Sequence, residues 1–166
     1  MPRNTERETI ARAIIVQDGR ILVNSAINKQ TEEPYCALPG GHADVMESCT
    51  ATLEREFREE LTADLNVGAL QFVSESIYEG RRRGDTPRHE IVLYFGAELT
   101  SPLGQEDGRL MSPEFDKNFI WLALDQLEAS NLLPVALREF LQANLAADGT
   151  IAAASVRYGF HDSVSY

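Results

Sequence analysis

Hydrophobic residues cluster along this chain in short runs that predict strands at its start. Residues 9–16 spell TIARAIIV and residues 20–24 spell RILVN, with Asp18 and Gly19 between them. β-Branched residues favour strands, and an Asp-Gly pair between two such runs is a strong signal for a tight turn. We therefore predict a β-hairpin near the start of the chain.

One amphipathic helix is predicted at about 47–61. Its apolar residues recur at every fourth position, at Cys49, Leu53, Phe57 and Leu61. That interval places them in one stripe along an α-helix. The Pro-Gly-Gly sequence at 39–41 predicts a break before the helix, where the backbone turns or lies close to another group.

The second half of the chain predicts three more strands and another helix. The strands are expected at 65–78, 91–95 and 118–122, and the helix at 132–146. The 91–95 run, IVLYF, is continuously apolar, as is typical of a strand buried on both faces. Pro134 is expected in the first turn of the helix, and Asp125 is expected to cap a short helix before it. The tail at 149–166 is ambiguous between an added strand and disorder.

The length and composition predict a single globular domain. The chain has 166 residues without repeats or Pro/Gly/Ser-rich linkers, so one domain over 1–166 is expected. Hydrophobic residues make up 43% and charged residues 25%, an ordinary globular balance. The mixture of strands and helices is compatible with an α+β or an α/β fold, and the hydrophobic pattern does not decide between them.

The charge balance narrows the classes of partner. Acidic residues outnumber basic ones 26 to 15, a net charge of −11, so we expect no nucleic acid and no membrane as partner. No apolar run approaches the ~20 residues of a membrane span, and the first ten residues lack the apolar core of a signal peptide. Cys36 and Cys49 form no CxxC pair, and we expect a reducing, cytoplasmic location.

Three glutamates in the predicted helix give the first indication of chemistry. Glu56, Glu59 and Glu60 stand at i, i+3 and i+4, so they share one side of the helix, where like charges repel. The helical wheel places Glu60 against the apolar stripe and the other two progressively closer to solvent. Carboxylate oxygens suit Mg²⁺, Mn²⁺ or Ca²⁺, which would offset the repulsion. A solvated acidic helix face is the alternative, and the Gly40-Gly41 pair before the helix favours the metal site.

The segment from Gly41 to Ala63 resembles the signature of the Nudix hydrolases, G-x5-E-x7-R-E-U-x-E-E-x-G-U, in which U is apolar. The residues at the required positions are Gly41, Glu47, Arg55, Glu56, Phe57, Glu59 and Glu60. The match fails only near its end, where Thr62 replaces the late glycine and Ala63 is a weak apolar residue. We expect that departure to affect the turn after the helix and not the set of carboxylates.

The resemblance implies a fold and a set of roles. The fold is α/β, a Nudix-like α/β/α sandwich with a small mixed sheet between helices. The three clustered glutamates and the backbone carbonyl of Gly41 would bind Mg²⁺ or Mn²⁺. The implied catalytic residues are Glu56, Arg55 and Glu47. In this assignment Glu47 pairs with Arg55, and Arg55 orients a catalytic glutamate.

The general base is left open. It is the glutamate matching Glu56 in some members of the family and a carboxylate from a later loop in others. Glu114 and Asp116 precede the predicted strand at 118–122, and Glu90 opens the strand at 91–95. Each of these three is also compatible with a plain surface carboxylate.

Substrate contacts are left open as well. Arg81, Arg82 and Arg83 form a basic run that could bind phosphates through guanidinium groups, or could be a solvated loop. Aromatic residues could stack a base, although in strands they usually belong to the core. The candidates are Tyr35, Phe72, Tyr78 and Tyr94.

The expected function is divalent-metal-dependent hydrolysis of the pyrophosphate bond of a nucleoside diphosphate derivative. A nucleotide sugar, ADP-ribose, a dinucleoside polyphosphate and a nucleoside triphosphate all fit the signature. A small nucleotide is favoured because an acidic chain repels a long polyanion. The alternatives are a catalytically inactive Nudix-like nucleotide-binding module and a structural acidic domain that takes up cations. A homodimer is one possible assembly.

Overall fold

The computed structural model describes residues 7–28, 31–78, 88–106, 109–110, 112–113, 117–152 and 157–162. Its strands are β1 (Arg7–Ile14), β2 (Val16–Gln17), β3 (Arg20–Ile27), β4 (Pro34–Ala37), β5 (Gly40–His42), β6 (Leu65–Tyr78), β7 (Arg88–Leu99), β8 (Gln105–Glu106), β9 (Arg109–Leu110), β10 (Phe119–Ala123) and β11 (Arg157–Asp162). Its helices are α1 (Cys49–Leu61), α2 (Val135–Asn144) and the short 3₁₀ helix η1 (Leu124–Gln126). Within these ranges no helix has the length and hydropathy needed to cross a membrane.

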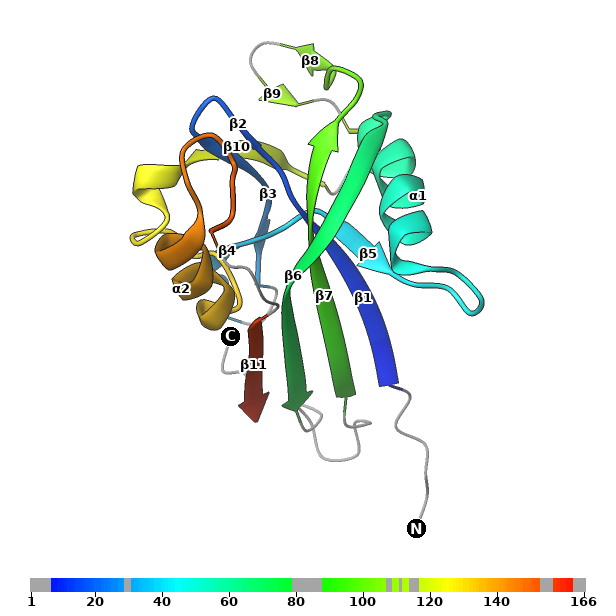
Figure 1. The fold of residues 1–166 in the computed structure, drawn as a ribbon, viewed down its shortest axis with the longest axis vertical. Coiled ribbons are helices and arrows are strands. Elements are labelled where there is room, and N and C mark those ends of the chain that lie inside the picture. The colour runs from blue at the N-terminus through cyan, green and yellow to red at the C-terminus, as the bar shows by residue number, and fades with distance from the viewer. Residues whose placement is uncertain are drawn as a thin grey trace.

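Two sheets form the framework of the molecule (Figure 1). The larger sheet has the strand order β11-β6-β7-β1-β5. It is mixed, because β1 runs parallel to β7 and antiparallel to β5. In the smaller sheet, β3 pairs antiparallel with β2, β4 and β10. β8 and β9 form a separate antiparallel pair.

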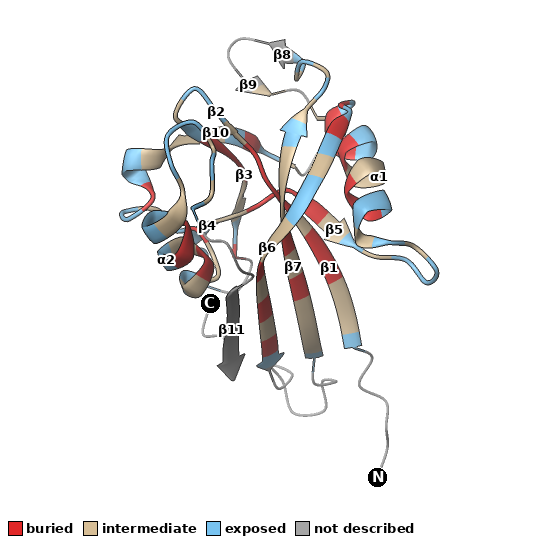
Figure 2. Ribbon diagram, viewed as in Figure 1, coloured by how far each residue is buried: buried red, intermediate tan, exposed pale blue. Residues whose placement is uncertain are grey.

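The two α-helices lie on opposite sides of the larger sheet. α1 packs Leu53 and Phe57 into a core with Ala11 of β1. α2 packs Leu141 into a second core with Ile10, the neighbour of Ala11 on the other face of the strand. Figure 2 shows the buried residues of β1, β6 and β7 between these helices. The arrangement confirms the predicted α/β/α architecture.

The predicted first hairpin is present, and its first strand is divided between the two sheets. β1 belongs to the larger sheet, whereas β2 belongs to the smaller one. Asp18 and Gly19 have φ angles of 50° and 69°. Two successive positive φ values are what a two-residue hairpin turn of this hand requires, which explains the Asp-Gly signal.

The strands predicted at 65–78, 91–95 and 118–122 are observed as β6, β7 and β10. The prediction that the IVLYF run is buried on both faces is wrong. Val92 and Tyr94 are buried, whereas Ile91, Leu93 and Phe95 on the other face keep partial exposure. The reason is that α1 packs mainly on β1, β5 and β6, so it covers β7 incompletely.

The second helix is shorter than predicted. α2 begins at Val135 because the backbone before it pairs with β4: Leu133 N–H donates to the Cys36 carbonyl at 2.9 Å. Pro134 therefore stands at the cap position, not in the first turn. The prediction that Asp125 caps a short helix is also wrong, because Asp125 lies inside η1 and Ala123 precedes it at the cap.

The first helix begins later than predicted, and the tail contributes a strand. α1 begins at Cys49 and not at residue 47, since the Ser48 side chain accepts a hydrogen bond from Ala51 N–H and so caps the helix. In the ambiguous tail, β11 adds a strand to the larger sheet, parallel to β6.

Candidate active site

β5 and α1 meet with almost no space between them. Gly41 pairs with Ala11 of β1, and a Cβ placed on Gly41 would overlap the Glu56 carboxylate. At Gly40, φ is +131° and a Cβ would overlap the carbonyl of Ala11. Gly40 therefore needs a residue without a side chain, because the overlap is with backbone, whereas a side chain at Gly41 would displace the flexible Glu56 carboxylate from its present position. The backbone of this turn therefore lies directly against the glutamate side of the helix, as the Pro-Gly-Gly sequence predicted.

Arg55 is the centre of an ion-pair network on that side. Its Nε and Nη2 donate to the two carboxylate oxygens of Glu47, at 2.9 and 3.1 Å. Its Nη1 donates to Glu56 at 3.0 Å and to Glu59 at 3.1 Å. Nη2 also donates to the carbonyl of His42, next to Gly41. One guanidinium thus holds three carboxylates and the end of β5 in a common arrangement.

The network holds its two central members in their charged forms. Hydrogen bonds from Arg55 lower the pKa of Glu47 to about 2, assisted by the Asp44 N–H and by the Thr52 hydroxyl. The same pairing, chiefly with Glu47, raises the pKa of Arg55 above its ordinary value. Glu47 is therefore a fixed anion and Arg55 a fixed cation at neutral pH.

The three clustered glutamates differ in burial in the predicted order. The Glu60 side chain is 5% exposed, Glu56 14% and Glu59 53%. The helical wheel predicted this gradient because the burial of a side chain on an amphipathic helix depends on its angular position around the helix axis.

Glu60 has a partner that sequence spacing does not indicate. The Nζ of Lys117 lies 2.8 Å from Glu60 Oε1. Lys117 comes just before β10, far along the chain from α1, and the fold brings the two together. The only local signal was that a buried carboxylate needs a counter-charge. The sequence offers 15 lysines and arginines as candidates for that counter-charge and so does not single out Lys117.

The donor set has the chemistry of a divalent-cation site. Hard divalent cations prefer carboxylate and carbonyl oxygens, and Glu56, Glu59 and Glu60 share one side of α1, where the Glu56 carboxylate lies against the backbone of Gly41. In the present arrangement Arg55 and Lys117 neutralise these glutamates. Across the described ranges, no three acidic, histidine or cysteine side chains converge on one point. The residues fit a metal ion by type and position, and their side chains would need to turn toward it.

Thr62 shows how the chain accommodates the missing glycine. It ends α1 in the left-handed conformation, with φ 50° and ψ 39°, and its N–H donates to the carbonyl of Arg58. The turn after the helix therefore keeps the shape that a glycine would favour. The expected effect on the turn is a strained conformation, not a different path.

Within the described residues, none of the other candidate site residues lies beside the three clustered glutamates. Glu90 follows the same alternation as Val92 and Tyr94, so it lies on the α2 side of the sheet, away from Glu56. Its Oε1 lies 3.9 Å from Nη1 of Arg88. Glu114, Asp116 and the run Arg81-Arg82-Arg83 lie outside the described residues.

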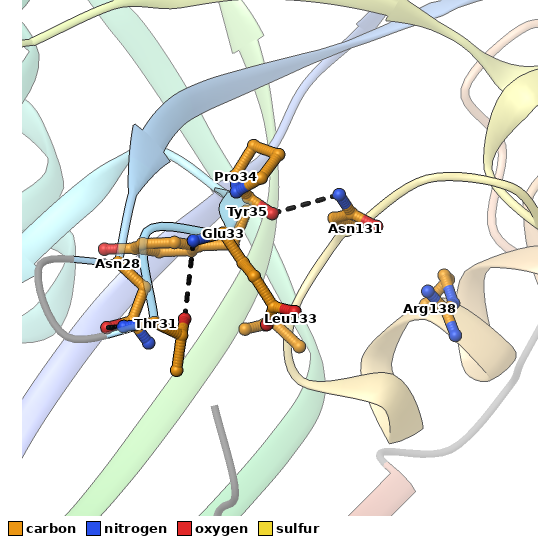
Figure 3. Close-up of a pocket in the computed structure, with 8 residues that line it drawn as sticks. All are labelled: Asn28, Thr31, Glu33, Pro34, Tyr35, Asn131, Leu133 and Arg138. Carbon is orange, nitrogen blue, oxygen red and sulfur yellow. Dashed lines mark hydrogen bonds between the residues drawn. The ribbon is translucent and has the colours of Figure 1, made fainter.

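A separate pocket opens between the β3–β4 connection and the start of α2 (Figure 3). Its lining residues are Asn28, Thr31, Glu33, Pro34, Tyr35, Asn131, Leu133 and Arg138. Asn131 donates from its amide to the carbonyl of Pro34 at 3.0 Å and so joins the two walls. Of the aromatic candidates, Phe72 and Tyr94 belong to the core, whereas Tyr35 lines this pocket.

Comparison with known proteins agrees with this fold. The NUDIX domain matches residues 7–143. Among solved structures, a MutT protein from Bacillus halodurans is similar with 16% identity and a TM-score of 0.66, over 95% of this chain and 91% of that one. A MutT NUDIX hydrolase from Burkholderia pseudomallei shares 25% identity with a TM-score of 0.52, over 72% and 85% of the two chains. A UDP-X diphosphatase shares 25% identity with a TM-score of 0.50, over 78% and 56%. No curated protein matches the chain in sequence.

The fold and the acidic helix beside β5 define an enzyme of the pyrophosphohydrolase class. Because the family match spans most of the chain, the protein belongs to the NUDIX family and is a Nudix hydrolase. Enzymes of this family act on pyrophosphate bonds and generally use divalent metal ions.

Proposed function

We propose that this enzyme hydrolyses the pyrophosphate bond of a small nucleoside diphosphate derivative in a reaction that depends on Mg²⁺ or Mn²⁺. The observation that carries the proposal is the grouping of three glutamates on one side of α1, with the Glu56 carboxylate packed against the bare backbone of Gly41. Glu56 is fixed there by Arg55, and Glu60 is buried.

The metal ligands are proposed to be Glu56, Glu59, Glu60 and the carbonyl of Gly41. A divalent cation bound there would neutralise the pyrophosphate, lower the pKa of a bound water and stabilise the leaving phosphate. For a chain with a net charge of −11, cations also reduce the repulsion of an anionic substrate.

Arg55 and Glu47 are proposed to position the glutamates. The forked contact with Glu47 fixes the plane of the Arg55 guanidinium, and its Nη1 then sets the orientation of the Glu56 carboxylate. An oriented and ionised Glu56 is the proposed general base. Glu114 and Asp116 stay alternative bases, since both precede Lys117, which itself contacts Glu60.

The substrate class is proposed from one similar solved structure and from the chemistry of the separate pocket in Figure 3. A solved relative of the fold is named as a UDP-X diphosphatase, which supports a nucleotide with a second moiety. The Figure 3 pocket has an aromatic ring at Tyr35, an amide at Asn131 and a guanidinium at Arg138, which suit a base or a sugar. Arg81, Arg82 and Arg83 are proposed contacts for substrate phosphate.

A panel of nucleotide sugars, ADP-ribose, dinucleoside polyphosphates and nucleoside triphosphates, each assayed with Mg²⁺ and Mn²⁺, tests the proposal. Released phosphate products are measured with and without EDTA. We expect turnover of at least one class, which chelation abolishes. Unchanged hydrolysis in EDTA would exclude the metal mechanism, and metal binding without turnover of any class would favour an inactive binding module.

Matched substitutions test the residue assignment. Glu60→Gln or Glu59→Gln should lower kcat by about 100-fold or more, because each removes a charged ligand at a step in which metal ions supply several kcal/mol. Glu54→Gln changes the same helix outside the matched signature and should leave kcat within about twofold. Equal losses in Glu54→Gln and Glu60→Gln would show that the assignment is wrong.

A further inference from the structure

The ion pair between Glu60 and Lys117 is the most buried charged contact of the acidic cluster. Glu60 is 5% exposed and Lys117 29%, and Nζ lies 2.8 Å from Oε1. The other two clustered glutamates are held by Arg55, which is itself held by Glu47. Lys117 therefore serves as counter-ion to Glu60, while Arg55 serves Glu56 and Glu59.

A buried carboxylate needs a positive partner in every state of the protein. An unpaired carboxylate charge in a protein interior costs several kcal/mol, so a positive charge must lie beside it. Without metal, Lys117 supplies that charge. With metal bound to Glu60, the requirement is met by a doubly charged ion, and the ammonium becomes redundant.

The two cations cannot share Glu60 without cost. A hard divalent ion binds a carboxylate oxygen at about 2.1 Å, whereas Nζ already occupies the hydrogen-bonding position of Oε1. Two positive charges around one carboxylate lie only a few ångströms apart and repel each other. Displacement of Lys117 from Glu60 would remove this repulsion when the metal binds.

A bound substrate would offer the Lys117 ammonium a new negatively charged partner close to Glu60. A pyrophosphate bound to the same metal ion places its oxygens within roughly 4 Å of the glutamate ligands, given metal–oxygen distances of about 2.1 Å. Lysine is a compact charge on a flexible stem, suited to transfer over such a distance.

We propose that Lys117 occupies Glu60 in place of a divalent cation and transfers to a substrate phosphate when that cation binds. The inference rests on the proposed function, because it takes Glu60 as a metal ligand. It adds a binding residue, Lys117, that lies outside the Nudix signature, and it makes metal affinity depend on an internal competitor.

Mn²⁺ titration of the full chain by calorimetry tests the competition. The proteins are wild type, Lys117→Met, Lys117→Arg and Arg58→Met. Arg58 is the matched control: it lies on α1 and forms an exposed pair with Asp64, so its loss changes the net charge equally without touching Glu60. We expect Lys117→Met to bind Mn²⁺ about tenfold more tightly, since a hydrogen bond to a charged group must no longer be broken. Arg58→Met should change the affinity by less than about twofold.

The outcomes separate this inference from the proposed function. If wild type and all variants bind no Mn²⁺, the metal-dependent function itself fails. If wild type binds Mn²⁺ and Lys117→Met binds it no more tightly than Arg58→Met does, only the competition is overturned. A tightening in Lys117→Met that Lys117→Arg does not share supports it.

Two further measurements keep the result independent of folding defects. In EDTA, Lys117→Met should lower the melting temperature, and the double variant Lys117→Met/Glu60→Gln should recover most of the loss because no buried charge is left unpaired. In the presence of saturating Mn²⁺, Lys117→Met should raise KM several-fold with a smaller change in kcat. An unchanged KM would overturn the transfer to substrate phosphate.

Discussion

At the scale of single residues, the candidate site depends on one arginine, Arg55, and on how its hydrogen bonds are divided among the neighbouring carboxylates. Arg55 donates from all three of its guanidinium nitrogens, to Glu47, Glu56, Glu59 and the His42 carbonyl. Glu47 receives the forked contact, so the position of the other glutamates depends on a residue that is not itself a metal ligand. Because the pKa of Glu47 is lowered by its pairing with Arg55, its contribution to the stability of the folded protein depends on pH.

The acid dependence of Glu47 can be measured through stability. Its pKa is lowered to about 2 in the folded protein from an ordinary value near 4.5, so its contribution is complete above about pH 5 and is lost as the pH falls toward 2. Glu47→Gln should therefore destabilise the protein at pH 7 and have a smaller effect at pH 3. Urea unfolding of both proteins at the two pH values checks this, with Glu54→Gln as control. An equal difference at pH 7 and pH 3 would contradict the assignment.

At the scale of elements, α1 is determined at both ends by single residues. Ser48 caps its first turn, and Thr62 ends it in the left-handed region. A β-branched residue in that region is unfavourable, because Cβ crowds the following carbonyl oxygen. The helix that carries the carboxylates thus ends in a strained turn.

Thr62→Gly should relieve this strain. We expect a gain of about 0.5–1 kcal/mol in the free energy of unfolding, since the left-handed cap favours glycine and the extra freedom of the unfolded chain offsets part of the benefit. Denaturant unfolding in EDTA measures the gain without any metal contribution. Thr50→Gly, a change within the same helix near its start, should instead destabilise by roughly 0.3 kcal/mol. Loss of stability in Thr62→Gly would show that the threonine side chain makes a compensating contact.

At the scale of the whole molecule, the acidic composition and the carboxylate cluster act in the same direction. A net charge of −11 repels an anionic substrate and is itself a source of self-repulsion in the folded chain. Cation binding reduces both effects and acts on the folded state, where the glutamates are already close together. Metal binding should therefore be visible in global stability.

Mg²⁺ or Mn²⁺ should raise the melting temperature. At 100 times its dissociation constant, a ligand specific to the folded state adds about 2.7 kcal/mol, or roughly 5–10 °C for a chain of this length. Thermal unfolding with increasing metal and a matched concentration of NaCl as ionic-strength control measures the shift. Glu59→Gln should reduce it, and a melting temperature that responds equally to NaCl and to Mg²⁺ would count against a specific site.

The sequence by itself determined the features that depend only on residues close together along the chain. The Asp18-Gly19 turn, the stripe of α1 and the burial order of Glu56, Glu59 and Glu60 all follow from periodicity and backbone preference within a few residues. The spacing of the signature likewise predicted the family before any three-dimensional information.

Tertiary structure decided the contacts that join distant segments. The start of α2 depends on pairing with Cys36, the incomplete burial of β7 depends on where α1 lies, and the partner of Glu60 is Lys117 beside β10. Sequence spacing cannot specify these, because two segments far apart along the chain become neighbours only through the packing of both sheets. A carboxylate's need for a counter-charge is a property of the residue, but which cation meets that need is a property of the fold.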